Sequence, residues 1–277
     1  MMEKIKVGFQ GEIGAYSEEA ALKFFGKNIE TIPCKTFDDV FKAIEKRKTN
    51  YGIIPIENSI EGSVGRNYDL LLDSNLKIFG EEVLRISHCF VVNGGVKLNS
   101  IRKVYSHPQA LGQCREFLRK LRIEEIPFYD TAGSCQMIKE KKLRDSAAIA
   151  SERAAEVYNL KILKRGIETN HKNFTRFFII GKKDKKPTGN DKTSIIFSTK
   201  HIPGALYKTL GIFVFFNINL TKLESRPIIG QPWKYNFYLD FEGHQKEKIV
   251  KEALKNLKYN CAFLKILGSY PKSKEKF

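Results

Sequence analysis

The chain has 277 residues, of which 42% are hydrophobic, so it is long enough for one large domain or two smaller ones and is not a disordered tail. Its 48 lysines and arginines stand against 31 aspartates and glutamates, a formal net charge of +17 that invites a nucleic-acid interpretation. Lysines outnumber arginines 36 to 12, and the sequence offers no recognition helix or stacking platform, so we expect no nucleic-acid partner.

The first two thirds of the chain alternates short β-branched runs with helical patterns, which predicts an α/β fold with largely parallel strands. Ser17 and Thr36 each precede acidic residues of a first helical turn, so we expect both to be N-cap residues. Pro108 opens a helix expected over 109–121. Strands are expected at residues 5–9, 29–33, 51–55, 83–92, 103–106, 126–129, 147–150 and 174–180.

A polar segment at residues 182–191 contains proline and glycine but no apolar residue, which predicts a linker between two domains. After it, strands are expected at 193–198, 218–224, 235–241 and 261–267, with helices at 203–215 and 245–257. This β-α-β-β-α-β order is typical of the ferredoxin-like class. We therefore expect a first domain over 1–182, a linker over 183–191 and a second domain over 192–277.

The five cysteines are widely separated, with no C-x-x-C pair and no histidine pair at metal-ligand spacing. We interpret them as buried free thiols in a reducing compartment. The chain starts directly with a strand pattern, and its longest strongly apolar run, residues 212–216, is far shorter than the ~20 residues of a membrane span. The sequence therefore predicts a cytoplasmic protein without a membrane partner.

Polar residues follow several predicted strands, at the edge where open α/β sheets bind ligands. Gly11-Glu-Ile-Gly-Ala-Tyr-Ser17 is a glycine turn before a helix, whose backbone N–H groups suit an anion, although tight-turn geometry is the commoner reason for such glycines. Pro55-Ile-Glu-Asn-Ser59 places an acid, an amide and a hydroxyl after a buried strand. From the residues alone, this segment fits a ligand site and a helix cap equally well.

Two further segments have the same placement. In Ser106-His-Pro-Gln-Ala110 the histidine is more often structural than catalytic, whereas Gln109 both donates and accepts and so suits orientation of a polar ligand. In Asn173-Phe-Thr-Arg-Phe177 the neighbours Thr175 and Arg176 should point to opposite faces of a strand unless the strand bends.

Taken together, in this order and at these separations, the four segments resemble the catalytic domain of prephenate dehydratases. Gly204-Ala-Leu-Tyr207, Asn219-Leu-Thr-Lys-Leu-Glu-Ser-Arg-Pro227 and Leu267-Gly-Ser-Tyr-Pro271 resemble the regulatory ACT domain of the same enzymes. The resemblance implies a two-lobed α/β catalytic domain similar to type 2 periplasmic binding proteins, followed by a ferredoxin-like ACT domain. It also implies decarboxylative dehydration of prephenate to phenylpyruvate in phenylalanine biosynthesis, a reaction that needs no cofactor and no metal.

The resemblance assigns roles to particular residues. Thr175 is implied to donate a hydrogen bond to the leaving hydroxyl, Arg176 to hold a substrate carboxylate, and Phe177 to exclude water from the ring. Glu57 is either protonated or holds neighbouring donors in place, and we favour the second role because a free carboxylate repels a dianionic substrate. The implied neutral donors to the substrate are Tyr16, Ser17, Asn58, Ser59, Ser106, Gln109 and Thr131.

The first loop departs from the G-P-x-G-T-F-S pattern of many family members. Its Ala-Tyr version, with Arg66-Asn-Tyr-Asp-Leu-Leu-Leu72 and Asp130-Thr-Ala-Gly133, also resembles arogenate dehydratases. Arogenate carries an amino group in place of the side-chain ketone of prephenate, so a few contacts decide the preference. We favour prephenate and leave arogenate as the alternative.

The resemblance further implies feedback inhibition by phenylalanine and assembly into a homodimer or homotetramer with paired ACT domains. A non-catalytic amino-acid-binding module is the competing interpretation, against which the intact N-F-T-R-F segment argues. A positive field over the surface would draw in a dianionic substrate. The implied effector residues are Gly204, Ala205, Leu206, Glu224, Ser225, Arg226 and Pro227.

Overall fold

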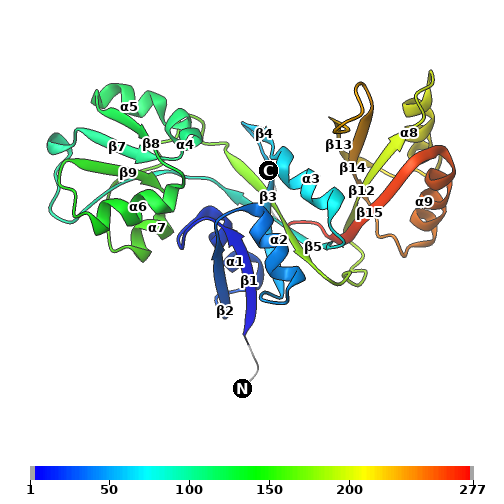
Figure 1. The fold of residues 1–277 in the computed structure, drawn as a ribbon, viewed down its shortest axis with the longest axis horizontal. Helices are drawn as coiled ribbons and strands as arrows, with labels where there is room; N and C mark the ends of the chain where they lie inside the picture. Colours follow the sequence, from blue (N-terminus) through cyan, green and yellow to red (C-terminus); the bar gives the residue numbers. More distant parts are fainter. Residues whose placement is uncertain (1–3, 275–277) are drawn as a thin grey trace. The chain divides into compact units, whose positions relative to one another are not determined.

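The computed structural model describes residues 4–274 and divides into two compact units (Figure 1). The first unit comprises the residues up to Val64 together with Glu82–Phe177. The second comprises Gly65–Glu81 and the residues from Phe178 onward. A short segment from the middle of the first predicted domain therefore packs with the C-terminal part of the chain. The linear domain boundaries expected from the sequence remain a prediction.

The first sheet has the strand order β2-β1-β3-β11-β5, with the short β4 paired to β3. Strand β1 is parallel to β2 and to β3, as the alternating pattern predicts. Helices α1 and α2 pack on β1 and β3, over core residues such as Phe9 and Ile53 that are fully buried. The elements are β1 (Ile5–Gln10), α1 (Tyr16–Phe25), β2 (Ile29–Cys34), α2 (Phe37–Glu45), β3 (Tyr51–Asn58), β4 (Gly62–Ser63), β5 (Lys77–Arg85) and β11 (Phe174–Gly181).

The second sheet has the order β10-β6-β9-β7-β8. Strand β7 is parallel to β8 and β9, whereas β6 runs antiparallel to β9 and β10. Phe90, Val104, Leu111 and Ile149 belong to the core beneath this sheet. The elements are β6 (Cys89–Val92), β7 (Lys103–Ser106), α4 (Pro108–Gln113), α5 (Arg115–Leu121), β8 (Glu124–Pro127), α6 (Thr131–Glu140), β9 (Ser146–Ala150), α7 (Glu152–Val157) and β10 (Lys161–Arg165).

The third sheet lies in the second unit and has the antiparallel order β13-β14-β12-β15. Helices α8 and α9 supply Phe213, Val250 and Leu254 to its core, against Ile195 and Phe241 of the strands. Its elements follow the order β-α-β-β-α-β, which confirms the expected ferredoxin-like class. They are β12 (Asp191–Thr199), α8 (Ala205–Phe215), β13 (Leu220–Pro227), β14 (Tyr235–Glu242), α9 (Lys248–Asn260) and β15 (Cys261–Pro271).

Helix α3 (Gly65–Asp73) is fixed to this third sheet at its middle and at its C-terminal end. Arg226 of β13 forms a forked ion pair with Asp69, with Nε and Nη2 at 3.2 and 3.0 Å from the two carboxylate oxygens. At the C-terminal end of α3, Lys265 Nζ donates to the carbonyls of Leu72 and Ser74, where a cation complements the helix dipole. These contacts explain why α3 groups with the C-terminal unit.

Three sequence expectations are wrong in detail. The predicted strand 83–92 is two strands, because the backbone N–H groups of Ile86 and His88 leave the ladder and donate to Asn173 O and the Glu168 carboxylate. The predicted helix 109–121 is two helices that meet at Cys114. Ser17 lies inside α1, whose N-cap residue is Ala15 and makes no side-chain capping hydrogen bond. Glu18 Oε2 accepts instead from the N–H of Gly14, just before the helix, at 2.7 Å.

Other local expectations are confirmed. Thr36 and Asp39 form a capping box at the start of α2, and Pro108 occupies the first turn of α4. All five cysteines are free thiols, although only three of them are buried. In the described part of the chain, no helix has the length and apolar character needed to cross a membrane.

Candidate active site

The ends of β3 and β11 are joined by Ser59, which directly follows β3. Its backbone N–H donates to Phe174 O at 2.8 Å, and its hydroxyl oxygen accepts from the Phe174 N–H at 3.0 Å. The hydroxyl hydrogen goes to the carbonyl of Lys172, 3.0 Å away. The Ser59 hydroxyl, which the sequence predicted to donate to the substrate, therefore donates to the backbone. Ser59 aligns the two strands that carry Asn58 and Thr175.

Asn58 connects β3 to Thr175 through its side-chain amide. Its Oδ1 accepts the backbone N–H groups of Ile60 and Glu61, both at 3.0 Å, and its Nδ2 lies 3.0 Å from Thr175 Oγ1. Because a backbone N–H only donates, the oxygen must face the loop and the nitrogen must face Thr175. The Thr175 oxygen thus accepts a hydrogen bond, and its own hydrogen is left to donate elsewhere.

The network continues from Asn58 into the second sheet. Asn58 Nδ2 also donates to Asn173 Oδ1 at 2.7 Å, and Asn173 Nδ2 donates to Gln113 Oε1 at 2.9 Å. The same Gln113 oxygen lies 2.9 Å from His88 Nε2, and His88 Nδ1 lies 2.9 Å from the Tyr16 hydroxyl. One chain of polar groups therefore runs from Thr175 to Tyr16.

The carboxylate of Glu168 lies beside the backbone of His88. The His88 N–H donates to this buried carboxylate at 2.8 Å. Burial would raise the pKa of Glu168, but the hydrogen bonds from His88 and His171 hold this pKa below its usual value. Burial lowers the pKa of His88 itself, which favours a neutral imidazole at neutral pH.

The glycine turn before α1 serves packing between elements. Gly14 adopts a φ of +95°, and a Cβ there would lie 2.7 Å from the Cα of Ala154. The Gly14 carbonyl accepts from Ser151 Oγ at 2.7 Å, and its N–H is bonded to Glu18. We expected the backbone N–H groups of this turn to suit an anion. The N–H and carbonyl of Gly14 are already hydrogen-bonded to protein groups.

The remaining predicted substrate residues occupy varied places. Ser106 is fully buried and donates to the Ile149 carbonyl at 2.6 Å. Tyr16 places its hydroxyl 2.8 Å from the Ser87 carbonyl as well as beside His88. Three predicted substrate-binding residues, Ser17, Gln109 and Thr131, do not contribute side chains to the hydrogen-bond chain that runs from Thr175 to Tyr16 within residues 4–274.

The other predicted catalytic residues belong to the same two strands, β3 and β11. Glu57 is half-buried and opposite Ser63 in the β3–β4 register. Arg176 is half-buried in β11, where strand alternation directs it to the face opposite Thr175. Phe177, only 2% exposed, belongs to the core.

Sequence reasoning missed three members of the network. Asn173 begins one of the segments that carried the resemblance and Gln113 lies three residues after another, so their placement was a readable signal. His88 had no such signal, because it lies inside the segment 83–92 that was predicted to be an ordinary strand. His107, in contrast, caps α4 by accepting from the Gln109 N–H, which is a structural role.

The predicted effector residues gather at one end of the third sheet. Strands β12 and β13 run in the same direction, since both are antiparallel to β14, so Gly204 before α8 and Pro227 at the end of β13 lie at the same end. A pocket of about 720 Å³ lies near this end, with walls from Thr199, His201 and Trp233 among others, but none of the predicted effector residues lines it. Glu224 pairs with Lys222 at 3.2 Å.

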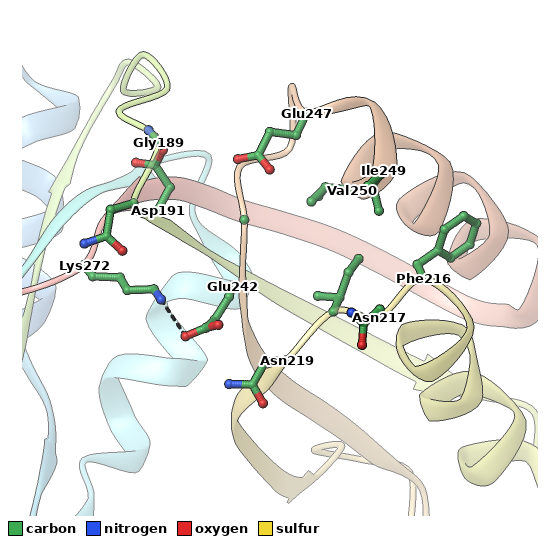
Figure 2. Close-up of a pocket in the computed structure, with 13 residues that line it drawn as sticks. Gly189, Asp191, Phe216, Asn217, Asn219, Glu242, Glu247, Ile249, Val250 and Lys272 are labelled. Carbon is green, nitrogen blue, oxygen red and sulfur yellow. Dashed lines mark hydrogen bonds and ion pairs between the residues drawn. The ribbon is translucent and has the colours of Figure 1, made fainter.

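Another pocket, of about 430 Å³, lies at the opposite end of the same sheet (Figure 2). Lys272 donates to Glu242 across its wall, and the Asp191 carboxylate accepts the N–H and hydroxyl of Thr188, both at 2.7 Å. Lys272, Glu242 and Asp191 thus have protein partners, and none of the predicted effector residues lines this pocket. We therefore do not assign the effector to this pocket.

The arrangement around Thr175 defines a class of protein. A hydroxyl is held as a hydrogen-bond donor by an amide whose orientation the backbone fixes, beside further amides and a neutral imidazole. Such a set suits an enzyme that assists the departure of an oxygen from a small polar substrate. Together with the α/β catalytic fold and the ferredoxin-like C-terminal domain, it indicates a carbon–oxygen lyase.

Comparison with known proteins gives the family. The family model described as prephenate dehydratase matches residues 7–185. The chain is 45% identical to a bifunctional chorismate mutase/prephenate dehydratase of Aquifex aeolicus, over 98% of this chain and 75% of that protein. The chain therefore belongs to the prephenate dehydratase family and is a hydro-lyase.

Two further comparisons bear on substrate and fold. The chain is 43% identical to arogenate dehydratase/prephenate dehydratase 2 of Arabidopsis thaliana, over 97% of this chain and 73% of that protein. A crystal structure of prephenate dehydratase from Arthrobacter aurescens in complex with L-Phe superposes with a TM-score of 0.88 at 29% identity, covering 96% of this chain and 90% of that one. The expected fold class and enzyme class are confirmed, and the activity is dehydration of prephenate or arogenate.

Proposed function

We propose that the main substrate is prephenate, converted to phenylpyruvate by decarboxylative dehydration, and that phenylalanine inhibits the enzyme through the ACT domain. The observation that carries the catalytic part is the hydrogen bond from Asn58 Nδ2 to Thr175 Oγ1, which leaves the threonine hydrogen for the substrate. Arogenate, converted directly to phenylalanine, is the alternative substrate.

The reaction balances without a redox partner. The bond from the ring to its carboxylate breaks, carbon dioxide leaves, and the electron pair enters the ring while the C–O bond on the opposite side breaks. The departing hydroxide takes up one proton and leaves as water. Thr175 stabilises the developing negative charge on this oxygen by a positioned hydrogen bond, and solvent supplies the net proton, because a threonine hydroxyl is a weak acid. Help of this kind is worth roughly 10² to 10⁴ in rate.

The other roles in the site are carried over from the family resemblance. Arg176 pairs with a substrate carboxylate, Phe177 keeps water from the ring, and Glu57 holds neighbouring donors in place. Neutral donors grip the carboxylates without over-stabilising the one that must leave. We assign this binding role to Ser17, Gln109 and Thr131. The side chains of Asn58 and Tyr16 act within the protein instead, because the Asn58 Nδ2 hydrogens go to Asn173 and Thr175 and the Tyr16 hydroxyl faces Ser87 and His88. Ser59 and Ser106 act by bracing the backbone, because their hydroxyl hydrogens are already used.

Feedback regulation is supported by the attachment of α3. Arg226 belongs to the predicted effector segment and grips Asp69, and α3 begins directly after the β3–β4 hairpin that carries Asn58. A ligand at the effector segment that shifts Arg226 would therefore move the helix attached to the active-site hairpin. Phenylalanine would inhibit by binding more tightly to an arrangement in which Asn58 no longer orients Thr175.

Assembly into a homodimer or homotetramer is supported by exposed apolar side chains in the ACT domain. Tyr207, Phe215 and Ile229 are each more than 80% exposed, and Trp233 is 79% exposed. Strand β13 is an edge strand of its sheet. Pairing of ACT domains would cover such residues. A cytoplasmic location also remains a proposal.

Parallel assays test the proposed function. Product formation from prephenate and from arogenate is followed with the native protein and with Thr175→Ala, in the presence and absence of phenylalanine. We expect turnover of prephenate to exceed that of arogenate, to fall in the variant and to fall with phenylalanine. Faster turnover of arogenate would reverse the substrate assignment, and no product from either would favour the amino-acid-binding module.

A further inference from the structure

The hydrogen-bond chain behind Thr175 has a direction that the backbone imposes. Its starting point is the loop N–H groups of Ile60 and Glu61, which can only donate and so fix Asn58 Oδ1 toward them. Asn58 Nδ2 must then donate to Asn173, whose facing atom must be its oxygen. Each amide in turn sets the orientation of the next.

The second half of the chain follows from the same rule. With its oxygen toward Asn58, Asn173 presents its nitrogen to Gln113, so the facing atom of Gln113 is an oxygen. An independent contact agrees, because the Gln113 nitrogen then faces the carboxylate of Glu61 at 3.4 Å. The same Gln113 oxygen faces His88 Nε2 at 2.9 Å, so this ring nitrogen must carry a hydrogen.

Tyr16 completes the assignment at the other ring nitrogen. Its hydroxyl has one hydrogen and two neighbours, the Ser87 carbonyl at 2.8 Å and His88 Nδ1 at 2.9 Å. A neutral imidazole with hydrogen on Nε2 has a lone pair on Nδ1, so the one Tyr16 hydrogen is shared between this lone pair and the Ser87 carbonyl. His88 is 2% exposed, and removal from water disfavours the doubly protonated ring.

We propose that His88 is a positioning residue for the dehydration reaction: in its neutral form with hydrogen on Nε2, it holds Gln113 and Asn173 so that Asn173 Oδ1 accepts from Asn58 and reinforces the orientation that the loop N–H groups give this amide. The proposal rests on the proposed function of Thr175. His88 does not bind the substrate in this account. It acts through two amides, and Tyr16 acts through His88 by occupying Nδ1.

A matched set of variants separates this role from a packing role. His88→Gln places an amide N–H near the position of Nε2, His88→Asn places one near Nδ1, and His88→Leu removes both. We expect kcat to fall about tenfold in His88→Leu and His88→Asn, with KM nearly unchanged and with recovery to within about threefold in His88→Gln. Thermal unfolding of each variant verifies that it is folded.

The outcomes are distinguishable. Equal kcat values for the folded Gln and Asn variants, or a folded Leu variant with native kcat, would overturn the proposal. Imidazole ¹⁵N NMR of the native protein provides a readout that does not depend on activity: we expect hydrogen on Nε2 of His88, and hydrogen on Nδ1 alone would overturn the proposal. Absence of dehydratase activity in the native protein with the expected tautomer would instead count against the proposed function.

Discussion

Asn58 Nδ2 donates to Thr175 Oγ1 over 3.0 Å, although 117 positions separate the two residues in the sequence. The direction of this hydrogen bond is set by two backbone N–H groups that hold the other end of the amide. It turns an ordinary threonine hydroxyl into a donor with a defined direction.

Asn58→Asp tests that direction. An aspartate keeps the size of the side chain and accepts the same backbone N–H groups, but its second oxygen would attract the Thr175 hydrogen instead of donating to the oxygen. We expect kcat to fall by about 10² or more, measured as product formation from prephenate. A folded variant with kcat within a few-fold of native would show that the orientation of Thr175 is unimportant.

Asp69→Asn tests the coupling between the effector segment and the active site. The substitution removes the charge that Arg226 grips on α3 but leaves the residues around Thr175 unchanged. We expect kcat without effector to stay within about twofold and the half-inhibitory phenylalanine concentration to change about fivefold or more. Asp73→Asn, the same change at the end of α3 away from Arg226, is the control. Equal inhibition of the native protein and both variants would contradict the coupling.

A buried ion pair predicts acid sensitivity of the first unit. Glu18, with its side chain 2% exposed, accepts from Arg153 Nε and Nη2 at 2.8 and 2.9 Å. Burial would raise the pKa of Glu18, but bonds from Arg153, Gly14 and Thr31 lower it below the usual value. A carboxyl group with a lowered folded-state pKa contributes stability above its unfolded pKa of about 4.3, and this contribution is lost as the pH falls through the folded value.

Urea unfolding as a function of pH measures this contribution. Glu18→Gln should lower the free energy of unfolding by about 3 kcal/mol at pH 7, because Arg153 loses its partner. The difference between variant and native protein should shrink below about pH 4. A difference that stays constant down to pH 2 would show that the loss comes from packing and not from the ion pair.

The net charge of +17 predicts a salt effect on substrate capture. Prephenate is a dianion, so a positive field accelerates encounter, and added salt screens it with a Debye length of about 8 Å at 0.15 M. We expect kcat/KM to fall as sodium chloride is raised, while kcat changes little. A kcat/KM that is constant over the same range would mean that the charge does not steer the substrate.

Sequence patterns predicted most of the architecture and a part of the site. The C-terminal β-α-β-β-α-β order was readable because strand and helix periods differ and the turns carry proline and glycine. The break between β5 and β6 could not be predicted, because an apolar run has the same pattern whether it stays in one sheet or passes to another. The attachment of α3 to the third sheet depends on Asp69 and Arg226, which are distant in the sequence and carry no shared pattern.

Within the site, the limits have a similar cause. Thr175 and Asn58 were identified because they lie in motif segments. The roles of Ser59 and Ser106 changed, since a hydroxyl residue in a sequence does not reveal whether its hydrogen goes to a ligand or to a neighbouring carbonyl. His88 was invisible for the same reason: its importance comes from the orientation of amides that belong to other elements.

The central claim is that the Thr175 hydroxyl assists the departure of the substrate hydroxyl, and single-turnover measurement of product formed from prephenate by Thr175→Val and Thr175→Ser tests it most directly. Valine keeps the shape without the hydroxyl, and serine keeps the hydroxyl. We predict a rate about 10² to 10⁴ lower for the valine variant and within about tenfold of native for the serine variant. A folded valine variant that forms product as fast as the serine variant would contradict the account.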